Sequence, residues 1–193
     1  MEILILFLPL IASIISGFFG KYIGDRNSEI VTSALVSVAA LLSVYVLYQV
    51  IVNQYEENIV IATWINSGSL DVNWSMLIDP LSAVMLVVVT SVSSLVHIYS
   101  IGYMSHDPHK PRFMAYLSLF TFAMLMLVTS DNFIQLFFGW EGVGLCSYFL
   151  IGFWFKKDSA NKAAIKAFVI NRVGDFGFAL GIFLIFYLFG TVN

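Results

Sequence analysis

Uncharged apolar segments recur along the chain, and each is about as long as a membrane is thick. A bilayer core of about 30 Å needs about 20 apolar residues in a helix. Residues 3–20, 30–55, 80–106, 113–130 and 176–193 contain no Asp, Glu, Lys or Arg. Residues 132–155 form another apolar segment, which carries the single charge of Glu141, and the last helix is expected to begin near Asn161. The pattern predicts an all-α membrane protein, a bundle of about six transmembrane helices at 3–20, 30–52, 80–103, 113–130, 132–155 and 161–190.

The segment between the second and third predicted helices has the pattern of β-strands. Residues 59–65 are mostly β-branched, and residues 66–69 favour a turn. Alternating positions then follow, with apolar side chains at Leu70, Val72, Trp74, Met76 and Ile78. This alternation predicts a short β-hairpin on the outer face. The expected organisation is helices 1–2 in 1–52, an external hairpin loop in 53–79, the third helix and an inner loop in 80–112, and helices 4–6 in 113–193.

Basic residues alternate between successive connections. The connections 20–29, 104–112 and 156–162 hold two, two and three Lys or Arg residues, whereas 53–79 and 130–132 hold none. Cytoplasmic loops carry an excess of Lys and Arg. The pattern therefore predicts that the three basic loops lie inside, with the N-terminus and Asn193 outside.

Composition excludes several other classes of protein. Hydrophobic residues make up 60% of the chain and charged residues 11%, against roughly 45–50% and 25% in soluble domains. The mean hydropathy of +0.90 likewise indicates an integral membrane protein. A formal charge of −3 gives no basic field for nucleic acid. One cysteine excludes a disulfide framework and a cysteine-based zinc site. The lipid bilayer is the expected surrounding.

Glu141 is the most informative single position, because a charge at the centre of a membrane helix costs about 2.5–3.5 kcal/mol. It lies within Gly139-Trp140-Glu141-Gly142-Val143-Gly144, where the glycines permit a neighbouring helix to approach closely. A role in moving protons or ions is one interpretation. A protonated glutamate that only hydrogen-bonds within a packing helix is the other.

The last predicted helix and the third supply four further candidates for a proton pathway. Arg172 and Asp175 are three residues apart and share a helix face, so they can form a pathway pair or a static ion pair. Lys166 can take part in a pathway or extend its ammonium group to the inner surface. His97 can relay protons or make a hydrogen bond between helices.

No cofactor is expected on this chain. Gly142-Val143-Gly144 begins a GxGxxG pattern, but Ser147 stands where the third glycine should be and no βαβ unit surrounds it. His97 is the only histidine in a predicted span, which excludes a bis-histidine haem within these residues.

Longer stretches around these residues resemble a known family. Residues 139–154 read GWEGVGLCSYFLIGFW, and residues 79–88, 95–104, 112–128 and 164–178 read DPLSAVMLVV, LVHIYSIGYM, RFMAYLSLFTFAMLMLV and AIKAFVINRVGDFGF. They resemble chain 5, or subunit L, of NADH:quinone oxidoreductase, the largest antiporter-like subunit of respiratory complex I.

The resemblance implies an antiporter-like fold of two inverted five-helix repeats that pumps protons. NADH, FMN, iron–sulfur clusters and quinone would be bound by other subunits. The expected partners are other membrane subunits of complex I, above all a neighbouring antiporter-like subunit. Glu141 matches the family's glutamate on the fifth helix, which interacts with a lysine on the seventh. Arg172 and Asp175 match its charged pair on the sixth.

Length is where the sequence departs from the family, whose members are several times longer. The seventh-helix lysine and the second repeat are missing from these 193 residues, so a fragment or a broken gene is expected. The bacterial cytoplasmic membrane is the expected location, with the mitochondrial inner membrane as the alternative. The large subunit of a multisubunit cation/proton antiporter and a membrane scaffold without transport activity are the competing functions.

The alternation of basic loops generates a test of topology. A reporter fused after Asn161 should lie on the cytoplasmic side, and one fused near Gly68 should lie outside, because positive loops are retained inside. Enzymatic reporters that are active on only one side of the membrane measure this. Finding both fusions on the same side would contradict the six-span arrangement.

Overall fold

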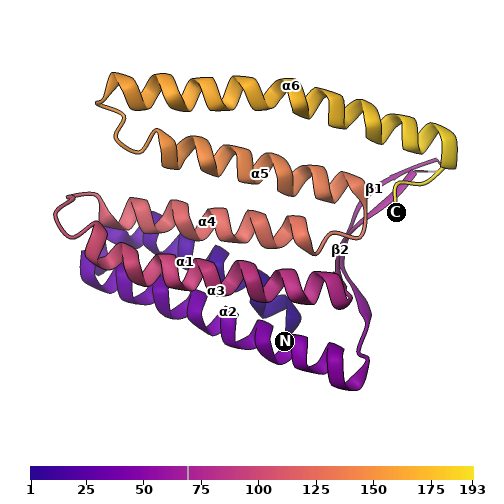
Figure 1. The fold of residues 1–193 in the computed structure, drawn as a ribbon, viewed down its shortest axis with the longest axis horizontal. Coiled ribbons are helices and arrows are strands. Elements are labelled where there is room, and N and C mark those ends of the chain that lie inside the picture. Colours follow the sequence, from indigo (N-terminus) through magenta and orange to yellow (C-terminus); the bar gives the residue numbers. More distant parts are fainter. Residues whose placement is uncertain (69) are drawn as a thin grey trace.

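The computed structural model describes residues 1–68 and 70–193 and contains, within them, six helices and one antiparallel hairpin (Figure 1). All six helices are long and apolar enough to cross a membrane. The predicted all-α membrane fold with a small hairpin is confirmed. The elements are α1 (Glu2–Ile23), α2 (Asp25–Asn53), β1 (Glu57–Ser67), β2 (Leu70–Ile78), α3 (Pro80–Tyr103), α4 (Lys110–Val128), α5 (Phe133–Ile151) and α6 (Asp158–Phe189).

Several helix ends differ from the predicted limits, because hydropathy marks the apolar part of a helix and not its ends. α2 begins at Asp25 instead of 30. It directly follows Gly24, whose φ of +86° is not helical and separates α1 from α2. α4 and α6 likewise begin three residues early, at Lys110 and Asp158, and α5 stops at Ile151 instead of 155. Acidic residues in the first turns of α2 and α6 favour these starts through the helix dipole.

α4 lies at the centre of the bundle. It packs against α1 and α5 and also contacts α2 and α3, so that α1–α3 lie on one side of it and α5 and α6 on the other (Figure 1). The main core lies among α1, α2, α3 and α4, with fully buried side chains at Ile5, Leu6, Leu86 and Leu125. α6 is much less covered, since its buried residues are Ala164, Asp175 and Ile182.

Hydroxyl side chains connect α2 and α3 inside the core. Ser37 and Ser94 approach to 2.7 Å between their Oγ atoms, and Ser43 Oγ lies 2.7 Å from Thr90 Oγ1. Hydrogen bonds of this kind contribute about 0.6 kcal/mol each in a membrane. They give these helices a polar seam that apolar packing alone would not supply.

The hairpin is fixed to the ends of α4 and α5. Gln135 of α5 makes two hydrogen bonds to the backbone of Ser75, accepting from its N–H at 2.9 Å and donating to its carbonyl at 2.6 Å. Leu77 N–H donates to the carbonyl of Thr129 at 2.8 Å. These bonds satisfy buried backbone groups of β2, and they set the position at which α5 begins.

The two loops at the opposite end of the helices are also joined. Trp154 Nε1 donates to Asp107 Oδ2 at 2.9 Å, and the backbone N–H of His109 donates to Asp107 Oδ1 at 2.8 Å. Partial burial acts to raise the pKa of Asp107, but these hydrogen bonds stabilise the carboxylate and leave its pKa lowered. The loop 104–109 is thereby tied to the loop 152–157.

Gly139 allows α4 and α5 to touch, and a substitution there tests the packing. A Cβ atom at Gly139 would lie 2.8 Å from Leu127 Cα and 2.8 Å from Leu127 N, whereas one at Gly102 of α3 meets nothing within 4 Å. We expect Gly139→Ala to destabilise the protein by about 1–3 kcal/mol, and Gly102→Ala to be neutral or slightly stabilising. The thermal midpoint of the purified intact subunit measures both, and equal midpoints would refute the close approach.

Candidate functional site

Glu141 lies at the middle of α5. The side chain of Asn132 caps the helix by accepting a hydrogen bond from Gln135 N–H at 2.8 Å. Glu141 is the ninth of the 19 helical residues, about 12 Å from the start at about 1.5 Å per residue. The start of the helix is fixed by the hairpin contacts of Gln135, so the depth of Glu141 follows from them. Glu141 therefore lies near the middle of its helix, and its depth in the membrane stays a prediction.

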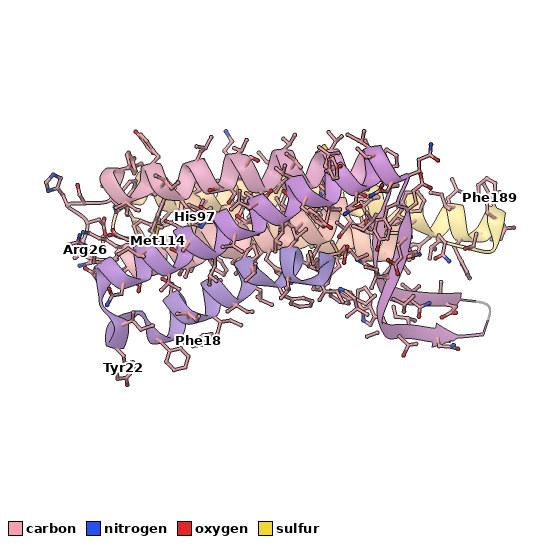
Figure 2. All side chains as sticks on the ribbon, turned by 90° about the horizontal axis from the view of Figure 1, so that it is seen from below. Phe18, Tyr22, Arg26, His97, Met114 and Phe189 are labelled. Carbon is pink, nitrogen blue, oxygen red and sulfur yellow. The ribbon has the colours of Figure 1, made fainter. Side chains whose placement is uncertain are left out.

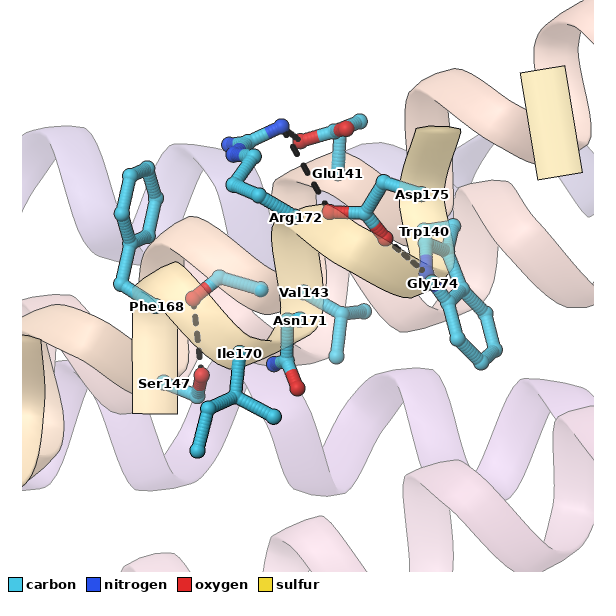
Figure 3. A pocket seen from close by; sticks show the side chains of 11 residues that line it. Trp140, Glu141, Val143, Ser147, Phe168, Ile170, Asn171, Arg172, Gly174 and Asp175 are labelled. Atoms are coloured by element: carbon cyan, nitrogen blue, oxygen red, sulfur yellow. Dashed lines mark hydrogen bonds and ion pairs between the residues drawn. The ribbon is translucent and has the colours of Figure 1, made fainter. Parts of the chain in front are cut away.

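Arg172 of α6 connects two carboxylates. Its guanidinium forms an ion pair with Glu141 across the two helices, and a second one with Asp175 at 3.6 Å between Nη1 and Oδ2. In Figure 3, dashed lines join Arg172 to both of these side chains. The predicted pairing within Arg172 and Asp175 is therefore present, and the same arginine also reaches the glutamate of the neighbouring helix.

Trp140 supports Asp175 from the other side. Its Nε1–H donates to Asp175 Oδ1 at 2.9 Å (Figure 3). The Asp175 carboxylate is thus held by one indole N–H and one guanidinium, which is the kind of partner set that a buried charge requires. The Arg172 guanidinium also lies 4.5 Å from the centre of the Phe168 ring, within the range of a cation–π contact.

The charges in this cluster do not balance when both acids are ionised. Two carboxylates face one guanidinium, which leaves one unit of negative charge uncompensated in Glu141, Arg172 and Asp175. Near the centre of a membrane such an excess is costly. It is removed when one carboxyl takes up a proton or when a further cation approaches. The arrangement is chemically suited to exchange a proton.

The cluster lines an open cavity of about 380 Å³ between α5 and α6. The side chain of Arg172 is 44% exposed, that of Glu141 23% and that of Asp175 8%. The guanidinium therefore faces the uncovered side of α6, whereas Asp175 is enclosed. The cavity side is where a further charged group could reach Glu141 without moving α5 or α6.

Two of the predicted pathway residues lie outside this cluster. Lys166 is exposed on α6 and forms no hydrogen bond or ion pair within residues 1–68 and 70–193. His97 is fully buried between α3 and α4, with Nε2 2.9 Å from Ser118 Oγ and Nδ1 2.8 Å from the carbonyl of Ser93. Its hydrogen bond between helices matches one of the two interpretations of the sequence. The roles of all five residues stay predictions.

Sequence reasoning missed two features of the site. For the hydrogen bond from Trp140 to Asp175, the only signal in the sequence was that the tryptophan stands next to Glu141. The sharing of Arg172 between helices was not signalled, because the rotation of α6 about α5 cannot be read from spacing. No cluster of three or more His, Cys, Asp or Glu side chains suited to a metal ion occurs in the described part of the chain.

Two family profiles match this chain. Residues 64–114 match the profile described as NADH-ubiquinone oxidoreductase (complex I), chain 5 N-terminus. Residues 130–193 match the profile described as NADH:quinone oxidoreductase/Mrp antiporter, TM. The second profile contains the whole cluster of Glu141, Arg172 and Asp175.

Individual proteins agree with the profiles. NADH-ubiquinone oxidoreductase chain 5 of Triticum aestivum is 58% identical over 193 residues, which are 100% of this chain and 29% of that protein. NADH-quinone oxidoreductase subunit L of Rhodobacter capsulatus is 52% identical over 200 residues, covering 100% of this chain and 28% of that protein. The structure of the Mrp complex from Dietzia sp. DQ12-45-1b matches with a TM-score of 0.83 at 23% identity, over 99% of this chain and 20% of that chain.

The solved structure supports the fold alone, and the fold is that of the antiporter-like subunits. This chain spans less than a third of the length of the two relatives. Both profiles and the identity along the whole chain nevertheless agree with the family that the segment around Glu141 indicated. The chain belongs to the family of chain 5 and subunit L of NADH:quinone oxidoreductase.

Proposed function

We propose that this chain is part of a proton-translocating membrane subunit of NADH:quinone oxidoreductase, in which Glu141, Arg172 and Asp175 handle protons. The observation that carries the proposal is the pair of carboxylates that face one guanidinium beside the middle of α5. A purely structural ion pair needs one acid for one arginine. The additional acid gives the cluster a site whose charge can change.

The cluster suggests how charge would move. While Arg172 alone faces both acids, a proton on one carboxyl balances the charge. When a second cation comes close to Glu141 from the cavity side, the ionised form gains a partner and the proton is released. Family resemblance suggests a lysine on the next helix of the intact protein as that cation. Because opposite charges a few ångströms apart interact strongly away from water, a small displacement is enough.

The electron-transfer chemistry is assigned to other subunits. The chain would belong to an enzyme complex as a translocase component, with NADH, FMN, iron–sulfur clusters and quinone bound elsewhere. Its partners would be further membrane subunits, above all a neighbouring antiporter-like subunit, for which the little-covered faces of α5 and α6 leave room.

We infer that the chain works in an energy-coupling membrane with its N-terminus outside. The bacterial cytoplasmic membrane was the first expectation from the sequence and the mitochondrial inner membrane the alternative. The wheat protein is 58% identical and the Rhodobacter protein 52%, so the relatives give no preference for the bacterial membrane. The orientation rests on the alternation of basic loops.

The large subunit of a multisubunit cation/proton antiporter is the less favoured alternative. One profile covers both kinds of protein, but the profile over residues 64–114 is described as complex I chain 5. The neighbouring genes discriminate between the two, since dehydrogenase genes accompany complex I and antiporter genes accompany the other system. A scaffold without transport activity is excluded if the substitutions below change pumping without changing assembly.

Glu141 is the first residue to test, in the intact complex. Glu141→Gln keeps the volume and hydrogen bonding but cannot change charge, so we expect proton pumping per assembled complex to fall about tenfold or more. Glu141→Asp keeps a carboxylate with a shorter reach and should retain part of the activity. Proton pumping and quinone reduction in membranes, normalised to assembled complex, measure this. A structural role predicts the reverse order, with Gln harmless and Asp at least as damaging.

Asp175 tests the sharing of Arg172. Breaking a buried ion pair costs about 3–5 kcal/mol. Asp175→Asn should cost less than this, because Arg172 keeps Glu141 as a partner, and it should impair assembly or pumping. Trp140→Phe removes only the indole N–H donor and should cost about 1 kcal/mol. Assembly by native gel electrophoresis and pumping per complex are the measurements, and normal values for Asp175→Asn would rule out the pairing.

A further inference from the structure

A second group of buried polar side chains lies far from the α5–α6 cluster, in the first turns of α2. Ser28, Glu29 and Ser33 are 0%, 5% and 7% exposed. The Oγ atoms of both serines and Oε1 of Glu29 have no hydrogen-bond partner. Buried polar atoms are almost always hydrogen-bonded, to protein or to ordered water. Glu29 and Ser33 are four residues apart and share a helix face, so their unpaired atoms point to one occupant beside them, whereas Ser28 Oγ faces Gly20 of α1.

Lys110, the first residue of α4, faces this group. Its Nζ lies 3.9 Å from Glu29 Oε1, close enough for charge attraction and too far for a hydrogen bond. Lys110 is the one charged side chain within ion-pair distance of Glu29 among residues 1–68 and 70–193. A polar contact of this length is commonly completed by a water molecule between the two groups.

The chemistry of the group favours water over a metal cation. One carboxylate and one hydroxyl oxygen could bind a hard cation, but the ammonium group of Lys110 would then lie beside a second positive charge. Water can donate to Glu29 Oε1, exchange hydrogen bonds with the hydroxyl of Ser33, and accept from Lys110 Nζ. Buried water typically makes about three hydrogen bonds, and Glu29, Ser33 and Lys110 supply that number of partners.

The group lies at the end of the helices that carries the basic loops. Figure 2 shows Arg26 at this end, and Met114 and His97 successively further along the bundle. Ser33 is followed one turn later by Ser37, which contacts Ser94 of α3. Glu29 is thus the only acid on a buried stripe of α2 that continues with hydroxyl groups into the polar seam, within the described chain.

We propose that Glu29 is a hydrated proton-binding site, in which ordered water held by Glu29, Ser33 and Lys110 exchanges protons with the aqueous phase at the basic-loop end. A proton arriving through the water binds to Glu29 Oε1 and leaves by the same route, and no other bond changes. The inference rests on the proposed function for its use, because a site that takes up protons on this side would serve a proton-translocating subunit. The water itself does not depend on that function.

The direct test is a high-resolution cryo-electron microscopy map of the intact complex. We expect density for at least one water within about 2.7–3.2 Å of two or more of Glu29 Oε1, Ser33 Oγ and Lys110 Nζ. The surroundings of Ala39, which is fully buried further along α2, should be dry. A map that resolves other buried waters but none at Glu29, or one in which the three side chains hydrogen-bond to each other, overturns the inference. Because no substitution is needed, a folding defect cannot obscure the result.

The use of the site is tested by pumping. Glu29→Gln should lower the number of protons pumped per NADH oxidised, and Glu29→Asp should retain part. Thr32→Val is the matched control, since Thr32 is buried one turn away but its hydroxyl already bonds to the carbonyls of Ser28 and Glu29. If Glu141→Gln lowers pumping and Glu29→Gln does not, proton uptake at Glu29 is refuted while the proposed function stands. If Glu29 is hydrated and needed but Glu141→Gln is harmless, the proposed role of Glu141 fails instead.

Discussion

One guanidinium shared by two acids is the interaction on which the α5–α6 region depends. α6 places Arg172 and Asp175 in a setting where an isolated charge is costly, and aromatic pairs such as Phe137 with Phe178 also hold this helix against α5. The ion pair with Glu141 therefore contributes to the attachment of α6 to α5 as well as to the chemistry. A change of charge at Glu141 would therefore also change how firmly α6 is held against α5.

The other four helices are held together in a different way. Side chains such as Leu86 and Leu125 fill the core, and hydroxyl pairs such as Ser43 with Thr90 bridge the helices at 2.7 Å. These contacts involve no charge. α5 packs against this part of the bundle where Gly139 meets Leu127 of α4. The bundle thus combines a well-packed part with a little-covered part that carries the cluster of Glu141, Arg172 and Asp175.

The sequence predicted the helices and the hairpin because their signals are local. Hydropathy over about 20 residues finds a membrane helix, and the alternation from Leu70 to Ile78 finds a strand. The helix starts at Asp25 and Asp158 were not predicted, because a helix can extend past the apolar segment into water. Within the site, the spacing of Arg172 and Asp175 was informative since it lies within one helix. The contacts from Arg172 to Glu141 and from Trp140 to Asp175 depend on how two helices rotate against each other, which no local pattern encodes.

Glu29 shows the limit of charge patterns most clearly. In the sequence it stands between Arg26 and the apolar run from residue 30, where an acidic residue looks like an ordinary member of a solvated loop. In the structure α2 already begins at Asp25, and Glu29 faces the interior at 5% exposure. α4 connects this interior to the α5–α6 cluster, because Lys110 at its start faces Glu29, and Ala123 and Leu127 further along face the glycines beside Glu141. α4 thus contacts the surroundings of both acids, so a shift of this helix along its axis would act on both.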